Sequence, residues 1–392
     1  MRVLHVTTSF PRGPKDFSGA FVYRLIRAQT KLRIVCHVLC PFSGNLEEDW
    51  PKDFKVYRFK YTSDPSNSLT GIAGGIPTAL KMRPSLYLQV PNFLFKLGQH
   101  VVRLSKDVDI IHAHWSICGA ICGITKKFHN LPIVTTLRGS DIHRAKSSSL
   151  YNLLHKICVK NSSALVGVSK SLLDELIDLD PRCQDKAFFI PNGVDQEFYN
   201  IPLLKRIEYP IRFLFIGSLI ELKQVDLLIS ALSLIKEDRH KWLLSIAGDG
   251  PMRSSLERLC MKLGVEESCV FLGNIAPSDI PNLIGRHHVL VLPSKREGRP
   301  NVVIEAMACA RLVITSDIKA CRELIIHKKN GLLFKAGSPD GLYKILKEVI
   351  ENPHIISSLG ESARDWMIKK DLTWPNCAKR YIELYREILE KH

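Results

Sequence analysis

Short runs of β-branched and apolar residues alternate with helix-length segments along nearly the whole chain. This alternation is typical of parallel sheets whose strands are joined by crossover helices. In the first half the predicted strands are 3–7, 34–39, 55–59, 110–113, 133–137, 164–168 and 187–190. In the second half they are 212–216, 242–246, 270–272, 289–292, 313–315 and 332–334. The sequence therefore predicts an α/β protein with two parallel sheets.

The segment 200–210 interrupts the alternation, because it carries two prolines and has no clear period. We place a domain boundary there, which gives domains over 1–205 and 206–375. A C-terminal helix over 376–392 is expected to pack back on the first domain. Both domains are predicted to be Rossmann-like, with a ligand at the carboxyl ends of the strands, in the cleft between the domains.

The chain is strongly basic, with 55 Lys and Arg, 39 Asp and Glu and a formal net charge of +16. Residues 1–205 account for +11 of this charge and residues 206–392 for +5. Such a charge favours an anionic partner: nucleic acid, a phosphorylated substrate or a lipid surface. The sequence has no helix-turn-helix, zinc-finger or aromatic RNA-binding motif, so nucleic acid is the least favoured of the three.

The 11 cysteines are scattered and often lie in apolar surroundings. This indicates buried, reduced thiols and a cytoplasmic location. No Cys-x-x-Cys pair occurs, and we assign neither Asp107-Val-Asp109 nor Asp178-Leu-Asp180 to a metal, so no metal site is expected. No apolar run reaches the length of a membrane span.

The densest motif is Pro293-Ser-Lys-Arg-Glu297-Gly-Arg-Pro-Asn-Val-Val-Ile-Glu305. It predicts a loop after a strand, and then a helix that begins at about Asn301. The unpaired N–H groups at the start of a helix make a cradle for a diphosphate. Glu297 and Glu305 are placed to accept hydrogen bonds from ligand hydroxyls. The alternative for each glutamate is a solvated charge at a helix end.

This motif resembles the donor site of retaining, metal-independent glycosyltransferases of the GT-B kind, the group 1 or family 4 class that builds polysaccharides and glycolipids. Further matching pieces follow in order along the chain: 16–20, 109–115, 136–141, 168–171, 190–195, 217–223, 247–251 and 271–274. The resemblance spans almost the whole chain. It implies transfer of a sugar from a nucleotide-sugar donor to a sugar or lipid-linked sugar acceptor, without a cofactor.

The resemblance also implies roles for individual residues. Glu297 would contact the donor sugar, Glu305 the ribose, and Lys223 the diphosphate. The catalytic set would be Glu297, Lys223 and His114. The remaining donor-site residues would be Gly19, Gly217, Ser218, Asn274, Gly298, Arg299 and Asn301. On the acceptor side, which the first domain would supply, the residues would be His112, Arg138 and Asp141.

Two positions depart from the family pattern. Ser218 stands where the family usually has arginine, and Arg299 or Arg296 is the candidate substitute. Arg138 stands where the family often has histidine, which leaves His112 and His114 as candidates for that role, with one of the two expected to be buried. These departures motivate an alternative function, a nucleotide-sugar-binding protein with impaired catalysis.

The resemblance implies transfer with retention of the anomeric configuration, in which the acceptor hydroxyl attacks from the face that the phosphate leaves. The leaving phosphate itself would take the proton of this hydroxyl, while the protein stabilises charge. Glycosidase chemistry is the competing interpretation of a glutamate pair. We reject it because one glutamate lies on a loop and the other within a helix. The segment 81–106, together with 146–160, is hypothesised to dock on anionic lipid at the inner face of the membrane. The alternative is an amphipathic helix that packs on the sheet.

Overall fold

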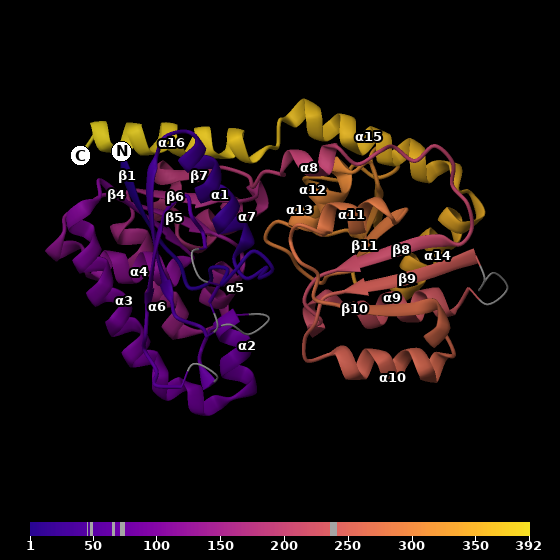
Figure 1. The fold of residues 1–392 in the computed structure, drawn as a ribbon, viewed down its shortest axis with the longest axis horizontal. Coiled ribbons are helices and arrows are strands. Elements are labelled where there is room, and N and C mark those ends of the chain that lie inside the picture. The colour runs from indigo at the N-terminus through magenta and orange to yellow at the C-terminus, as the bar shows by residue number, and fades with distance from the viewer. Residues whose placement is uncertain (45, 48–49, 65–66, 71–74, 236–240) are drawn as a thin grey trace. The chain divides into compact units, whose positions relative to one another are not determined.

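The computed structural model describes residues 1–392 except 45, 48–49, 65–66, 71–74 and 236–240. Its contacts divide the chain into two compact units (Figure 1). Unit 1 comprises Met1–Gly193 and Trp374–His392, and unit 2 comprises Val194–Thr373. Residues 194–205, which the sequence pattern places in the first domain, fall in unit 2, and the C-terminal helix falls in unit 1.

Unit 1 is built on a parallel seven-stranded sheet with the order β3-β2-β1-β4-β5-β6-β7. Its strands are β1 (Arg2–Val6), β2 (Val35–Pro41), β3 (Lys55–Phe59), β4 (Ile110–His114), β5 (Ile133–Leu137), β6 (Ala164–Gly167) and β7 (Ala187–Phe189). Its longer helices are α1 (Ala20–Lys31), α2 (Gly75–Met82), α3 (Val90–Leu104), α4 (Ser116–Ile124), α5 (Ser140–Ser147), α6 (Ser149–Asn161), α7 (Lys170–Leu179) and α16 (Trp374–Glu390). A 3-10 helix, η2 (Pro84–Gln89), joins α2 to α3.

Unit 2 is built on a parallel six-stranded sheet with the order β10-β9-β8-β11-β12-β13. Its strands are β8 (Ile211–Ile216), β9 (Trp242–Ala247), β10 (Cys269–Gly273), β11 (Val289–Leu292), β12 (Leu312–Ser316) and β13 (Leu332–Phe334). Its helices are α8 (Gln196–Tyr199), α9 (Val225–Ser233), α10 (Arg253–Leu263), α11 (Ile280–Gly285), α12 (Asn301–Ala308), α13 (Lys319–Arg322), α14 (Pro339–Glu351) and α15 (His354–Lys370). The 3-10 turn η6 (Glu221–Lys223) precedes α9.

Both sheets reverse their strand order at one point, between β1 and β4 in unit 1 and between β8 and β11 in unit 2. In such sheets, ligands bind beyond the carboxyl ends of the two strands that flank the reversal. The prediction of an α/β protein with two Rossmann-like sheets is confirmed, and each predicted strand corresponds to one observed strand.

The helix α16 joins unit 1 although it follows unit 2 in the sequence. Its buried side chains recur at helical spacing, from Trp374 through Cys377 and Ala378 to Tyr381 and Tyr385. This apolar stripe packs against α1 and completes one of the cores of unit 1 (Figure 1, yellow against indigo). The last residues of the chain are therefore part of the first folding unit.

All 11 cysteines are buried and free, as predicted. None of the helices within the described ranges is long and apolar enough to cross a membrane.

Candidate functional site

The carboxyl ends of β8, β9 and β10 are tied together by backbone hydrogen bonds. The N–H of Gly217 donates to Ala247 O at 3.0 Å, and the N–H of Gly248 donates to Gly273 O at 2.7 Å. Gly248 has φ +128, and a Cβ there would lie 2.0 Å from Gly217 O, so only glycine fits. This packing brings Gly217, and with it Ser218, to the same sheet edge as Gly273 and Asn274.

Lys223 and Glu297 meet beside the point where the strand order reverses. Lys223 ends the turn η6 after β8, and Glu297 lies in the loop after β11. The N–H of Lys295 donates to Leu222 O at 2.9 Å, which ties the loop to the turn. Lys223 Nζ then donates to Glu297 Oε1 at 2.5 Å, with the two side chains 20% and 12% exposed. The structure therefore brings together two of the predicted catalytic residues.

The helix α12 begins at Asn301, as the motif predicts. Its first turn has no side-chain cap and no acidic residue, and it directly follows the loop that contains Gly298 and Arg299. Glu305 lies one turn inside the helix and is partly buried, as are Gly298, Arg299 and Asn301. The geometry suits an anion beside Lys223.

In unit 1, Gly19 precedes α1 in a left-handed conformation, with φ +67. A Cβ at this position would lie 2.3 Å from the carbonyl oxygen of Ser9. The backbone alone therefore requires glycine here. The predicted contact of Gly19 with the donor stays a prediction.

Three histidines form a buried cluster at the strand reversal of unit 1. His5 on β1 pairs in register with His112 on β4, and all three side chains of His5, His112 and His114 are 0% exposed. Arg138 Nη2 donates to His114 Nδ1 at 3.2 Å, because a guanidinium has no acceptor. His114 must then carry its proton on Nε2, which donates to His5 Nδ1 at 3.3 Å.

His112 belongs to a second chain of hydrogen bonds that reaches the C-terminal helix. Gln29 Nε2 donates to the hydroxyl of Tyr385 at 3.0 Å, and this hydroxyl lies 2.6 Å from His112 Nδ1. His112 Nε2 lies 2.7 Å from Thr136 Oγ1, which in turn lies 2.8 Å from the hydroxyl of Tyr381. Both nitrogens of His112 are thus engaged by protein groups.

The three histidines have ligand atoms within 4.8 Å of one another, which is the number and spacing that a metal ion needs. Burial lowers the pKa of His5 to about 3 and holds the pKa values of His112 and His114 well below the usual range. Neutral imidazoles suit a metal, but a metal-bound histidine donates its other N–H to an acceptor. His114 faces the donor Arg138 instead. The cluster therefore fits a polar network and does not fit a metal centre.

Arg138 follows β5 and is held on several sides. Its guanidinium lies 4.1 Å from the ring centroid of Phe21 and 5.9 Å from that of Trp115. Its Nη1 donates to Asn192 Oδ1 at 3.3 Å. Burial lowers the pKa of Arg138 to about 10.

Asp141 does not pair with this guanidinium, because its carboxylate accepts hydrogen bonds from backbone N–H groups instead: those of Ser116, Arg138, Gly139 and Ile142.

The structure thus places His112, His114, Arg138 and Asp141 next to one another, all in unit 1. His112 and His114 are both fully buried. Sequence reasoning missed several further residues of this network: His5, Phe21, Gln29, Asn192, Tyr381 and Tyr385. His5 had a readable signal, since it is a polar residue inside an apolar strand that is buried on both faces. Tyr381 and Tyr385 had none, because their partners lie far away in the sequence.

Both parts of the chain match known families. Residues 18–198 match the model of Glycosyltransferase Family 4, and residues 204–366 match that of Glycosyl transferases group 1. The chain belongs to the group 1 glycosyltransferases. An uncharacterized glycosyltransferase of Methanocaldococcus jannaschii is 27% identical over 86% of this chain and 91% of its own length.

Two further similarities agree with this family. The N-acetyl-alpha-D-glucosaminyl L-malate synthase of Bacillus anthracis is 25% identical over 84% of this glycosyltransferase and 92% of its own length. The crystal structure of Anabaena HepE in complex with UDP and glucose has a TM-score of 0.78 at 18% identity, and covers 99% of this chain and 100% of HepE. The likeness to HepE confirms the GT-B fold.

Proposed function

We propose that this glycosyltransferase moves a sugar from a nucleotide-sugar donor to a hydroxyl of a saccharide or lipid-linked saccharide. We further propose that it retains the anomeric configuration and needs no metal. The observation that carries the proposal is the ion pair of Lys223 and Glu297 beside the uncapped start of α12. A cation and a helix N-terminus together make a site for the diphosphate of a donor.

The ion pair suggests how the donor site exchanges partners on binding. The diphosphate carries more negative charge than a single carboxylate, so it competes with Glu297 for Lys223. Glu297 Oε1 then becomes available to accept a hydrogen bond from a hydroxyl of the donor sugar. Glu305, which lies one turn inside α12, is assigned to the ribose. Arg299 is assigned to the second phosphate, because Ser218 stands where the family usually has an arginine for that phosphate.

Catalysis in this proposal is electrostatic. The bond between the sugar and the diphosphate breaks as the acceptor hydroxyl attacks from the same face, and the leaving phosphate takes the hydroxyl proton. Lys223 and the N–H groups of α12 stabilise the charge that develops on the diphosphate. A divalent metal would serve the same purpose, so these groups support a metal-independent reaction.

We also propose that the protein lies on the inner, anionic face of a membrane, on the cytoplasmic side. Residues 75–106 contain no acidic residue. Four exposed apolar side chains in this segment stand among exposed basic ones: Met82, Tyr87, Leu88 and Phe95 among Lys81, Arg83, Arg103 and Lys106. The opposite face of α3 packs in the core through Phe93, Leu97 and Val101. Exposed apolar groups among cations are typical of surfaces that bind anionic lipid.

A thermal-shift panel of UDP-, GDP- and ADP-sugars tests the proposed donor site. A donor at about 100 times its dissociation constant stabilises the folded protein by about 2.7 kcal/mol. Glu305→Ala should weaken the shift for the free nucleotide and for the sugar nucleotide alike. Glu297→Ala should weaken only the part that depends on the sugar. UDP-sugars are the first donors to try, because HepE was crystallised with UDP and glucose.

Glu323→Ala is a matched control, since it removes a carboxylate from unit 2 outside the matching motifs. Equal responses from the Glu297 and Glu305 variants would overturn the assignment of their roles. A donor that binds without turnover, with any acceptor, would support the alternative of a nucleotide-sugar-binding protein with impaired catalysis.

A further inference from the structure

We infer that Arg138 is a receptor for an anionic group, a carboxylate or a phosphate, on the acceptor. This inference rests on the proposed function and adds the chemical class of the acceptor. Neither family match assigns such a group. The inference depends on the charge balance around Arg138, on its unused donors and on the rigidity of its surroundings.

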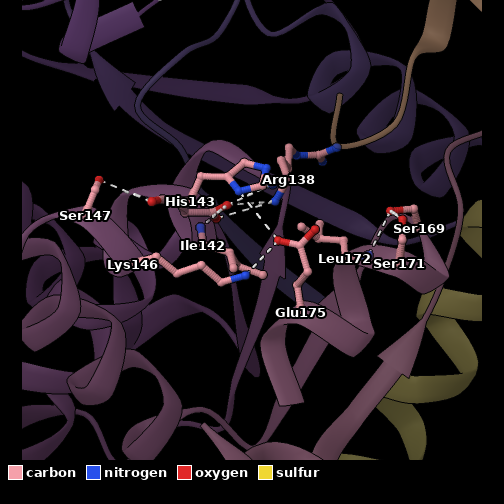
Figure 2. A network of polar contacts seen from close by, with 11 residues as sticks. Arg138, Ile142, His143, Lys146, Ser147, Ser169, Ser171, Leu172 and Glu175 are labelled. Atoms are coloured by element: carbon pink, nitrogen blue, oxygen red, sulfur yellow. Dashed lines mark hydrogen bonds and ion pairs between the residues drawn. The ribbon is translucent and has the colours of Figure 1, made fainter. Parts of the chain in front are cut away.

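Arg138 is a cation without a carboxylate partner within the described part of the chain. The Asp141 carboxylate is occupied by backbone N–H groups. Glu175 is occupied as well, because it pairs with Lys146 at 3.1 Å and lies 3.5 Å from His143. Figure 2 shows the Arg138 side chain extending away from the Glu175 carboxylate. Its side-chain acceptors are neutral, namely His114 and Asn192.

A partly buried cation among neutral groups is costly for a folded protein. Burial has the corresponding effect on the guanidinium, since it lowers the pKa of Arg138 to about 10. His5, His112 and His114 add no negative charge, and any proton on them would raise the positive charge nearby. An anionic ligand would remove this cost, so the charge balance favours an oxyanion over a neutral hydroxyl.

Arg138 also has N–H donors that no hydrogen bond of the described residues uses. A guanidinium has five N–H groups, and the described chain supplies acceptors for one on Nη1 and one on Nη2. Nε is buried and has no hydrogen-bond partner. The residue nevertheless keeps part of its surface accessible. The unused N–H groups have the fork geometry that matches a carboxylate or a phosphate.

The surroundings of Arg138 hold the fork in place before any ligand arrives. Phe21 stacks on the guanidinium at 4.1 Å, and His114 is fixed as an acceptor by its own bond to His5. Trp115, which also faces the guanidinium, has φ +70, a conformation that a non-glycine residue rarely adopts. Such strain persists where the surrounding structure imposes it, and it often marks a binding site. A preorganised fork loses less entropy on binding an anion.

Nitrogen NMR of the full-length protein, labelled with ¹⁵N-arginine, tests the inference directly. The Nε–H signal that disappears in Arg138→Lys belongs to Arg138. Methyl glucuronide and inorganic phosphate, added at constant ionic strength, should each shift this signal in a saturable way if the site takes either oxyanion. Methyl glucoside, which lacks the carboxylate of the glucuronide, should leave the signal in place. A response to one anion only identifies a carboxylate site or a phosphate site.

Arg27→Gln is the matched control, because it removes one positive charge from an exposed position on α1. In that variant the Arg138 signal should respond to the anions as in the unmodified protein. An Arg138 signal that moves with neither anion, or that moves equally with methyl glucoside, would overturn the inference. This readout needs no turnover, so the anion site and the proposed function can fail separately.

A second arm compares turnover of acceptor pairs that differ only in the anionic group. The kcat/KM for the charged acceptor should exceed that for its neutral counterpart by about 10- to 100-fold, the usual effect of a hydrogen bond to a charged group. Arg138→Lys should raise KM for the charged acceptor and leave KM for the donor unchanged. Equal kcat/KM values for the two acceptors would contradict the inference.

Discussion

The candidate sites of the two units both lie near the strand reversals of their sheets but differ in how their charges are balanced. In unit 2, Lys223 is paired with Glu297 at 2.5 Å, so the site balances its own charge. In unit 1, Arg138 is surrounded by an aromatic ring, an amide and a neutral imidazole. In the proposed function the first site exchanges the Glu297 carboxylate for a diphosphate on binding, whereas the second site has a cation without a carboxylate partner among the described residues before a ligand arrives.

The sites also differ in how the chain builds them. The residues around Lys223 come from loops that directly follow strands of one sheet. The hydrogen-bond network that contacts Arg138 through His114 contains residues of β1, β4, β5, α1 and the last helix, α16. We therefore expect the acceptor side to depend on the integrity of the whole of unit 1, and the donor side to depend on a few local contacts.

The largest expected effect is on stability in acid. His5, His112 and His114 stay neutral in the folded protein, with the pKa of His5 lowered to about 3 by burial. Below about pH 6.5 these histidines bind protons in the unfolded chain but stay neutral in the folded protein. The stability that unit 1 has at neutral pH is therefore lost as the pH falls. Unit 1 should lose on the order of 6 kcal/mol of stability between about pH 7 and about pH 5, about 2 kcal/mol for each of the three histidines. Calorimetry with mapping of the proteolytic fragments measures this loss.

His5→Gln removes one titrating group and should make the pH dependence of unit 1 shallower. His354→Gln, at an exposed position of unit 2, is the control and should leave it unchanged. Unit 2 has a smaller buried pair, His287 and His288, the latter with its pKa lowered to about 4 by burial. If unit 2 unfolded first in acid, the comparison of the two units would be wrong.

The next effect is on catalysis. Lys223→Ala should lower kcat by about 100- to 1000-fold, the usual cost of removing one group that stabilises charge in the transition state. Lys295→Ala removes a neighbouring lysine that is half exposed and pairs with Glu221, and it should change kcat little. Steady-state kinetics with varied donor measures both. Similar losses in the two variants would mean that the general charge of the loop matters and that the position of Lys223 does not.

A smaller effect is expected from the network behind Arg138. Tyr385→Phe removes the hydroxyl between Gln29 and His112, and should destabilise unit 1 by about 1 to 3 kcal/mol by leaving buried polar groups unpaired. Denaturant unfolding measures the loss. Tyr343→Phe, on α14 of unit 2, is the control. An unchanged free energy of unfolding in Tyr385→Phe would show that α16 holds unit 1 through apolar contacts alone.

The smallest effect concerns the proposed membrane surface. Leu88 is 85% exposed, and Leu88→Gln should weaken binding to anionic vesicles by about fivefold, as expected for partial burial of one leucine. Ile368→Gln removes an apolar side chain that is 59% exposed in unit 2, and should have no effect. Co-sedimentation with and without anionic lipid compares the variants. Absence of binding by the unmodified protein at low salt would refute the membrane proposal.

Sequence reasoning was most successful where structure is local. The strands and the start of α12 follow from short segments whose periodicity and motifs can be read directly. The proposed acceptor side was only half predictable. His112, His114 and Arg138 stand next to strand ends, whereas their partners Tyr381 and Tyr385 are brought to them by the packing of a helix more than 240 residues away. Periodicity shows that such a helix has an apolar face, but not which polar atoms that face will meet.

The most direct test of the account is to follow nucleotide release and glycoside formation with a panel of sugar nucleotides and paired charged and neutral acceptors. We predict that one class of donor is consumed, and that one nucleoside diphosphate is released for each glycoside formed. We also predict that Lys223→Ala lowers kcat with every acceptor, while Arg138→Lys raises KM for the charged acceptor alone. Release from no donor with any acceptor would contradict the proposed transfer. Equal effects of the two variants on donor and acceptor would contradict the division of roles between the two units.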